Sequence, residues 1–283
     1  MNKGYNQMKS KTTKLTNGWQ SEINLIETTS GEQYIRKNYT FDDDTILKNE
    51  WKTLTFLYNK GYSVPKPIKI DKDGIYMQYV EKGALWDVYN DSDSKTQQDL
   101  MKKYAKLLYD LHAVDISCIK ESYKGKFVEN ELTEIRNIIE KHNLNDYLKI
   151  LKKLETESLN IIEQPLCFIH RDYHPWNVLV DNYKLYTIDI FYTQGDYRFD
   201  VGWAYVHMKR TSTDDNFANF AENFLTEYQK LNPDVINDFE FFKQLANLRW
   251  LANVRPGELS EKPEFFQKMI KEAELIMNKY IHI

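Results

Sequence analysis

Cysteine is scarce in this sequence, with two residues in a chain of 283. Cys118 and Cys167 are not spaced like the ligands of a structural zinc site, and Cys167 stands in an apolar run where a buried free thiol is expected. This usage does not predict a disulfide-stapled secreted domain. The expected location is a reducing compartment, by default the cytoplasm.

Long apolar runs are missing as well. No stretch approaches the roughly 20 apolar residues of a membrane-spanning helix, and the polar, Lys-rich first 14 residues do not resemble a signal peptide. With 42% hydrophobic and 28% charged residues, the composition is that of a globular protein that can bury a large core. We therefore expect no membrane partner.

A strong excess of one charge is absent too, because the formal net charge is −4 at pH 7. This balance, without any basic stripe, argues against a nucleic-acid partner. The charge is nevertheless uneven: residues 1–80 contain 12 Lys and Arg against 9 Asp and Glu, whereas residues 81–283 contain 26 against 33. A basic first part favours a polyphosphate ligand, and an acidic second part favours a cationic one.

The first 80 residues predict short strands around one helix. Turn signals at Ser30-Gly31 and Asp73-Gly74 indicate two hairpins. The acidic triplet at 42–44 offers N-cap chemistry for a helix that reaches about Lys60 and ends at Gly61. The expected strands cover residues 22–28, 33–39, 66–71 and 75–80. The expected order is therefore strand, strand, helix, strand, strand.

After Val80 the apolar spacing becomes helical. Helices are predicted over residues 95–112, 127–142 and 146–157, and over several stretches from Val201 to the end. The change of character at Glu81-Lys82-Gly83 is the expected domain boundary. The sequence thus predicts an α+β protein with one domain over residues 1–80 and a second over residues 81–283.

Residues 170–177 carry the most informative pattern, His-Arg-Asp-Tyr-His-Pro-Trp-Asn, and Asp189 follows twelve positions after Asn177. Phosphoryl transfer from a nucleotide needs one carboxylate to orient and deprotonate the acceptor hydroxyl, and an Asn and an Asp to hold Mg²⁺. Apolar strings on both sides predict short strands that fix the loop, at 166–169, 178–180 and 185–188. The spacing therefore predicts a phosphotransferase catalytic loop.

A second interpretation of the same loop is a metal-dependent hydrolase. His170, Asp172 and His174 alternate, so on an extended strand they would share one face and could be metal ligands. The other histidines stand alone, without ligand spacing: His112, His142, His207 and His282. The low ligand count favours the phosphotransferase.

Together these motifs resemble the aminoglycoside phosphotransferase and choline kinase family, small-molecule kinases with a protein-kinase-like fold. The resemblance runs from about residue 15 to residue 202. Besides the 170–177 motif, it rests on the segment Gly195–Trp203, the helix end Leu107–His112 and the hinge-like Met77–Val80. It implies a bilobal fold, with a small β-rich N-terminal nucleotide-binding lobe that contains one helix. The larger, mainly helical C-terminal lobe would carry catalysis and acceptor binding.

By this resemblance Asp172 is the catalytic base, and Asn177 and Asp189 are catalytic residues that also bind Mg²⁺. A structural interpretation of Asp189, as a turn residue after a strand, stays open. Asp200, at the expected start of a helix, should accept backbone N–H bonds from the catalytic loop.

The family pattern also implies a nucleotide site in the first lobe. Lys37 is expected to contact the α- and β-phosphates of ATP or GTP. Arg36 is the alternative, because a one-residue slip of the strand exchanges its two faces. Glu50 on the following helix is expected to pair with the lysine and hold it.

The remaining nucleotide contacts carry less sequence information. Gln78 and Val80 are expected to bind adenine through backbone groups. The expected phosphate loop, between residues 15 and 25, has Gly18 but no G-x-G-x-x-G. Asp189 is followed by Ile-Phe in place of Phe-Gly, and no Ala-Pro-Glu follows. The missing activation segment argues against a protein substrate.

The sequence leaves the acceptor open. If the acceptor is an aminoglycoside, its phosphorylation would imply antibiotic resistance. Binding such a polycation needs a cleft of carboxylates, for which the candidates are Asp196, Asp214, Asp215, Glu222 and Glu227. A choline-like amine needs an aromatic box, for which the candidates are Trp203, Tyr205 and Trp250. Macrolides, sugars and other hydroxylated metabolites stay open, and so does the choice between monomer and homodimer. A non-enzymatic alternative is a catalytically idle kinase-like protein that serves as a scaffold or ligand binder. Such a protein would have no physical need for Asp172, Asn177, Asp189 and Lys37 together, so their presence argues against it.

Overall fold

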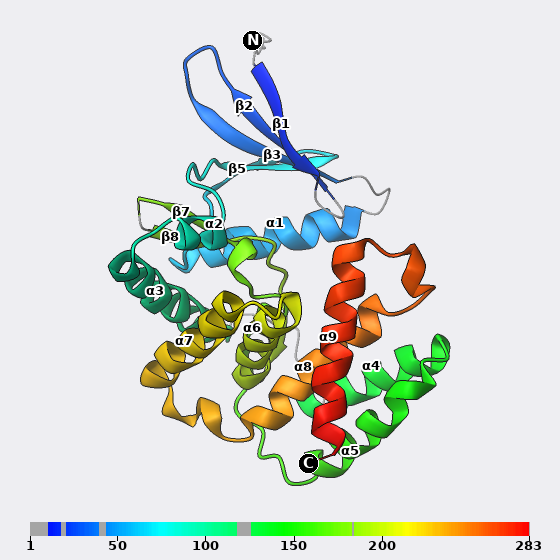
Figure 1. The fold of residues 1–283 in the computed structure, drawn as a ribbon. Helices are drawn as coiled ribbons and strands as arrows, with labels where there is room; N and C mark the ends of the chain where they lie inside the picture. Colours follow the sequence, from blue (N-terminus) through cyan, green and yellow to red (C-terminus); the bar gives the residue numbers. More distant parts are fainter. Residues whose placement is uncertain (1–10, 18–20, 40–43, 118–125, 183, 283) are drawn as a thin grey trace. The chain divides into compact units, whose positions relative to one another are not determined.

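The structure is a computed structural model that describes residues 11–17, 21–39, 44–117, 126–182 and 184–282. The chain forms two compact units. Unit 1 comprises residues up to Val88 together with Trp176–Tyr192, and unit 2 comprises Tyr89–Pro175 and the chain from Thr193 onward. A small antiparallel sheet dominates unit 1 and helices dominate unit 2 (Figure 1).

Unit 1 is built on a five-stranded antiparallel sheet with the strand order β1-β2-β3-β5-β4. The strands are β1 (Lys11–Asn17), β2 (Ser21–Glu27), β3 (Gln33–Tyr39), β4 (Pro67–Ile70) and β5 (Gly74–Gln78). Helix α1 (Asp44–Asn59) packs against β4 and β5. Both predicted hairpins are confirmed, and the predicted helix is present with nearly the expected bounds.

Strand β1 is an addition to the expected order, which began with β2. Its sequence, Lys-Thr-Thr-Lys-Leu-Thr-Asn, has a single large apolar residue and no alternation that would predict a strand. It forms because β2 offers an unpaired edge, along which Lys11 to Asn17 run antiparallel to Glu27 to Glu22. A polar outer strand also covers that edge against further pairing.

The segment Trp176–Tyr192 returns to unit 1 after the chain has left it, which differs from the expected division at residue 80. It contains the hairpin β7 (Val178–Asp181) and β8 (Lys184–Thr187), predicted from the apolar strings. Backbone bonds tie the hairpin to unit 1: Lys82 N–H to Val180 O, Val180 N–H to Gly83 O, and Thr187 N–H to Ser63 O. Helix α2 (Leu85–Asn90) crosses the division between the units.

Unit 2 consists mainly of helices, most of which share one apolar core. The helices are α3 (Ser94–His112), α4 (Phe127–Lys141), α5 (Leu148–Ser158), α6 (Tyr197–Thr211), α7 (Asp215–Leu231), α8 (Phe239–Val254) and α9 (Glu264–Ile281). Two short strands, β6 (Cys167–Phe168) and β9 (Gln194–Gly195), pair with each other. The predicted helices at 95–112, 127–142 and 146–157 correspond to α3, α4 and α5.

Helix α6 lies in the middle of unit 2, packed against α7, α8 and α9 (Figure 1). It is buried on nearly all sides, polar residues included. Gly202 allows α6 and α8 to approach closely, because a Cβ atom at this position would lie 2.9 Å from the backbone nitrogen of Lys243 on α8. At its start, the fully buried Asp196 accepts from the backbone of Arg198 and pairs with its guanidinium at 2.7 Å. The position of α6 is therefore tightly fixed.

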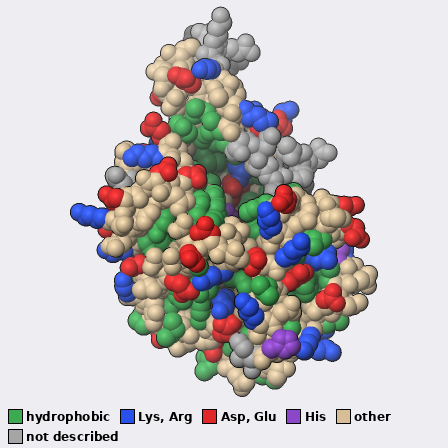
Figure 2. Space-filling model, in the orientation of Figure 1, with side chains coloured by type: hydrophobic (Ala, Val, Ile, Leu, Met, Phe, Trp, Pro, Cys, Tyr) green, Lys and Arg blue, Asp and Glu red, His purple; other side chains and the backbone are tan. Residues whose placement is uncertain are grey.

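On the face of unit 2 that Figure 2 shows, basic and acidic side chains are interspersed. No basic stripe of the kind that binds nucleic acid lies on that face. Within the described ranges, no helix is both long and apolar enough to span a membrane.

Candidate active site

The loop that follows β6 in unit 2 is held by a buried carboxylate of α6. Asp200 accepts the backbone N–H of His170 through Oδ2 and that of Arg171 through Oδ1, the latter at 2.7 Å. The backbone of Arg171 is left-handed, with φ 65°, and its guanidinium donates to Glu131 of α4 at 2.7 Å. The predicted bonds from Asp200 to this loop are confirmed.

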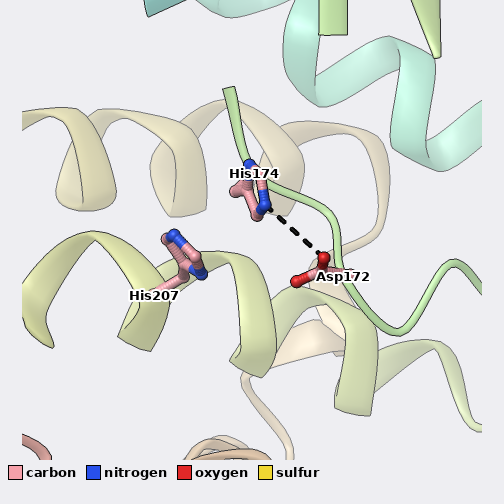
Figure 3. Close-up of side chains that lie close together, drawn as sticks. All are labelled: Asp172, His174 and His207. Carbon is pink, nitrogen blue, oxygen red and sulfur yellow. Dashed lines mark ion pairs between the residues drawn. The ribbon is translucent and has the colours of Figure 1, made fainter. Parts of the chain in front are cut away.

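Asp172 stands at the end of this braced segment with both carboxylate oxygens engaged. Trp203 of α6 donates its indole N–H to Oδ1 at 3.2 Å, and Nε2 of His174 lies 3.6 Å from Oδ2 (Figure 3). Loss of hydration by itself would raise the pKa of Asp172. The charge and the hydrogen bond of His174 outweigh this effect and hold the pKa of Asp172 below its usual value. Asp172 is therefore ionised at neutral pH.

Sequence reasoning missed the part of α6 that faces Asp172. Trp203 was assigned to an aromatic box, and His207 was treated as an isolated histidine. The ring of His207 lies against that of His174, with centroids 4.3 Å apart (Figure 3). A signal was available: Asp200, Trp203 and His207 are spaced by three and four residues, which places them on one stripe of a helix.

A second cluster of charges lies in unit 1, around Lys37. Its ammonium group lies 2.8 Å from each carboxylate oxygen of Glu50 on α1 and 2.5 Å from Oδ1 of Asp189. Lys37 is 7% exposed and Glu50 4%, whereas 45% of the Asp189 side chain is accessible. The expected pairing of Lys37 with Glu50 is present, and Asp189 joins it.

Burial and charge act in opposite directions on this cluster. Burial by itself would lower the pKa of Lys37, but the carboxylates of Glu50 and Asp189 more than compensate and raise it. Burial also raises the pKa of Glu50, against the attraction of Lys37. Lys37 is thus a permanent cation at neutral pH, held by two carboxylates.

The alternation of β3 decides between Lys37 and Arg36. Ile35 and Lys37 both line a pocket in unit 1, as period-two alternation requires. The guanidinium of Arg36 instead pairs with Asp71 at 3.2 Å and lies over the ring of Tyr76. Arg36 therefore belongs to the sheet's opposite face, and the cation of the pocket is Lys37.

The pocket has a volume of about 540 Å³, which is within the range of small-molecule sites. Its apolar wall includes Leu15, Ile23, Ile35, Leu54, Met77, Leu179 and Ile190. Its polar lining includes Lys37, Glu50, Asn177 and Asp189, together with Ser21, Gln78 and Glu81, and Val80 also lines it. Gly18, expected in the phosphate loop, lies outside the described residues. The pocket is thus mostly apolar, and the Lys37–Glu50–Asp189 cluster forms a polar part of its lining.

Asp189 takes up its place through a left-handed backbone, with φ 54°. Asp tolerates this conformation, so it serves as the turn residue after β8 that the structural interpretation suggested. The same turn points its carboxylate toward Lys37. The two interpretations of Asp189 are therefore compatible.

The side chains considered for acceptor binding are largely engaged elsewhere in unit 2. Asp196 is fully buried against Arg198, so it cannot face an acceptor. Glu222 pairs with Lys209 at 2.8 Å and Glu227 with Lys230 at 2.6 Å. Asp214 caps α7, and only 6% of Trp203 and of Trp250 is exposed. Asp196, Trp203 and Trp250 are therefore corrected as acceptor contacts, because they are buried within the protein. The remaining candidates stay predictions.

Comparison with known proteins places this geometry in a family. The sequence profile described as the phosphotransferase enzyme family matches residues 11–241. The chain belongs to the phosphotransferase enzyme family. It is thus a small-molecule phosphotransferase, which excludes the hydrolase interpretation of the 170–177 loop. No curated protein matches the chain.

Similar solved structures share the fold at low identity. An ethanolamine kinase of Plasmodium vivax has a TM-score of 0.71 and 16% identity, over 96% of this chain and 83% of its own. An ADP-bound aminoglycoside phosphotransferase APH(2'')-Ib has a TM-score of 0.66 and 20% identity, over 96% and 93%. A choline kinase of Cryptosporidium parvum has a TM-score of 0.68 and 11% identity, over 98% and 90%. The protein-kinase-like fold is thereby confirmed.

The charge cluster around Lys37 generates a prediction for stability. Lys37→Met leaves the buried Glu50 carboxylate without its main cation and should lower the free energy of unfolding by about 3 kcal/mol. The double variant Lys37→Met/Glu50→Leu should recover most of this loss, because no buried charge is left unpaired. The deficit of the single variant should shrink as the pH falls, since burial raises the pKa of Glu50 and its protonated form needs no cation.

Urea denaturation at about pH 8 and about pH 5.5 measures both effects. Lys14→Met is the control, because Lys14 and Glu22 form an exposed pair whose loss should change stability little. A double variant no more stable than the single one would contradict this account of the cluster.

Proposed function

We propose that this phosphotransferase moves the γ-phosphoryl group of ATP or GTP, with Mg²⁺, to a hydroxyl group of a small cationic molecule. One observation carries the proposal: Lys37, Glu50 and Asp189 meet in the lining of a pocket that Asn177 also lines. A buried lysine steadied by a helix glutamate, with an aspartate and an asparagine beside it, is the arrangement that phosphoryl transfer requires.

The pocket suits a nucleotide in both of its parts. Its apolar wall matches a purine ring, and its volume matches a ligand of that size. Lys37 is held in the polar part of the lining, where it would bind the α- and β-phosphates. Gln78 and Val80, at the end of β5, would meet the base through backbone groups.

Asn177 and Asp189 fit the requirements of a Mg²⁺ site. Both offer hard oxygen atoms to the same pocket, and nearly half of the Asp189 side chain is accessible. When bound, Mg²⁺ would supply positive charge that neutralises the phosphates. The contribution of the chain is to hold the amide of Asn177 and the carboxylate of Asp189 in place, the latter by Lys37.

Asp172 is our candidate for the base. It is ionised, its backbone segment is braced by Asp200, and its Oδ1 is held by Trp203. Such a carboxylate would accept the proton of the acceptor hydroxyl and orient the oxygen for attack. Its weak basicity is sufficient because the loose transition state of phosphoryl transfer requires orientation more than proton affinity.

A cationic acceptor is supported by charge and by the structural neighbours. Acidic residues exceed basic ones in residues 81–283. Ethanolamine, choline and aminoglycosides, named in the similar structures, all carry amine-derived positive charge. Screening amino alcohols, aminoglycosides and neutral sugars for ADP or GDP release tests the proposal. Nucleotide turnover without any phosphorylated acceptor would favour an idle or hydrolytic kinase-like protein.

The first prediction from this proposal concerns the base. Asp172→Asn should lower kcat by roughly two to three orders of magnitude, because the acceptor hydroxyl loses the carboxylate that orients it. The affinity for the Mg–nucleotide complex should change little. Steady-state kinetics and nucleotide titration measure the two quantities. Asp110→Asn, on the exposed face of α3, is the matched control. A kcat equal to that of the unsubstituted enzyme would remove Asp172 from the reaction.

The second prediction concerns the metal. Asp189→Ala should weaken the binding of Mg–ATP far more than that of metal-free ATP, because the lost contact acts through the cation. Calorimetric titration with Mg²⁺ and with excess chelator separates the two affinities. Equal losses under both conditions would assign Asp189 a structural role, through its bond to Lys37.

The third prediction concerns the acceptor. Attraction between an acidic surface and a cation is screened over a Debye length of about 10 Å at 0.1 M salt. The KM for the cationic acceptor should therefore rise with ionic strength, while kcat stays nearly constant. Initial rates across a salt series measure this, with the KM for the nucleotide followed in parallel. A neutral molecule as the best acceptor, with a flat salt response, would refute the cationic assignment alone.

A further inference from the structure

Arg210, in the last turn of α6, is a fully buried cation without a carboxylate partner among the described residues. Its guanidinium lies over the rings of Trp250, at 4.2 Å from the centroid, and Trp203, at 5.2 Å. Nη2 donates to Nδ1 of His207 at 3.2 Å, and Nε and Nη1 are buried without a hydrogen-bond partner. Burying a charge without a partner costs free energy, so a nearby negative charge is needed to offset the burial of Arg210.

The bond from Arg210 determines the state of His207. A guanidinium has only donors, so Nδ1 of His207 must accept and the ring proton lies on Nε2. Burial, followed by the charges of His174 and Arg210, lowers the pKa of His207, so the ring is neutral. The rings of His207 and His174 lie against each other (Figure 3). The two imidazoles thus connect Arg210, which donates to His207, with Asp172, which pairs with His174.

The negative charge that complements Arg210 is that of Asp172. Burial lowers the pKa of Arg210 to about 9, and the charge of Asp172 opposes this shift. Arg210 therefore remains a cation at neutral pH. Trp203 joins the two groups a second time, because it stacks on Arg210 and donates to Asp172.

A metal site would be the other interpretation of this cluster. Asp172, His174 and His207 offer ligand atoms within 4.8 Å of one another. A ligating imidazole, however, normally donates its second N–H to an acceptor, whereas His207 faces the donors of Arg210. A guanidinium so close to a ligand would also repel a dication. The cluster is therefore better suited to balance the carboxylate than to hold a metal.

We propose that Arg210 and His207 are positioning residues: Arg210 balances the charge of the Asp172 carboxylate, and the neutral ring of His207, packed against His174, helps to keep that carboxylate oriented toward the acceptor. This inference rests on the role proposed for Asp172. The ionisable groups around that carboxylate are His170 and His174 in its own loop, His207 and Arg210 on α6, and Tyr104 on α3. Arg210 is the guanidinium of this set and remains a cation at neutral pH.

Arg210→Met tests the inference, because the substitution removes the charge and leaves an apolar chain between two indoles. The acid limb of kcat/KM against pH should move upward by roughly one pH unit, and kcat should fall about tenfold. The KM for the nucleotide should stay unchanged. Arg210→Lys should restore most of the profile. Arg136→Met, in a half-buried ion pair with Glu155 of α5, is the control and should keep the parent profile.

A second readout is independent of activity. In protein labelled with ¹³C-aspartate, the Asp172 carboxyl resonance, assigned by its loss in Asp172→Asn, should titrate at higher pH in Arg210→Met than in the parent. An unchanged titration with a lower kcat would reduce Arg210 to a packing role and overturn the inference. If no acceptor is phosphorylated, the proposed function fails, while the titration still decides whether Arg210 supports Asp172. Circular dichroism verifies that each variant is folded.

Discussion

The fully buried carboxylate of Asp200 is the constraint on which the loop that carries Asp172 depends. An ionised group removed from water must be satisfied by hydrogen bonds, and Asp200 takes two of them from consecutive backbone N–H groups of the loop. His112 of α3 stands 3.3 Å from the same carboxylate. These bonds hold the left-handed turn at Arg171, so the direction in which Asp172 leaves the loop follows from the burial of one charge on α6.

Helix α6 combines this support with several others along one stripe. Asp200, Trp203, His207 and Arg210 follow one another at spacings of three or four residues, which places them on the same side of the helix. In chain order, Asp200 binds the loop backbone and Trp203 binds one oxygen of Asp172. His207 packs against the ring of His174, and Arg210 is the buried cation. Because α6 is covered by helices on its other sides, this stripe is rigidly presented. Gly202 contributes by letting the α8 backbone approach closely.

The two units treat buried cations in opposite ways. Lys37 is matched by Glu50 and Asp189, so its burial is compensated within hydrogen-bonding distance. Arg210 has aromatic faces and one imidazole nitrogen, and its complementary charge is that of Asp172. The first arrangement keeps a cation ready in the lining of a pocket. The second places a cation where its charge complements a single carboxylate. Because Arg210 lies over the buried rings of Trp203 and Trp250, these rings are not available to bind an external amine.

Local patterns determined much of what the sequence predicts about this protein. Period-two alternation in β3 put Lys37 on the pocket face, and turn residues and helical periodicity located the hairpins and helices α1 and α3 to α5. The motif at 170–177 and its spacing to Asp189 identified the family. These features are legible because each depends on neighbours within a few residues in the chain.

Tertiary structure alone decided the rest. Strand β1 exists because the edge of β2 is available, and Trp176–Tyr192 joins unit 1 because its backbone finds partners near Ser63 and Gly83. The neighbours of Asp172 come from a helix some thirty residues onward, so only packing reveals them. Likewise, the sequence suggests Asp196 as a ligand for a cationic acceptor, but in the fold its carboxylate is buried in an ion pair with Arg198. The physical reason is general: periodicity reports which face of an element is buried, whereas the partner of a buried charge is chosen by the elements that pack around it.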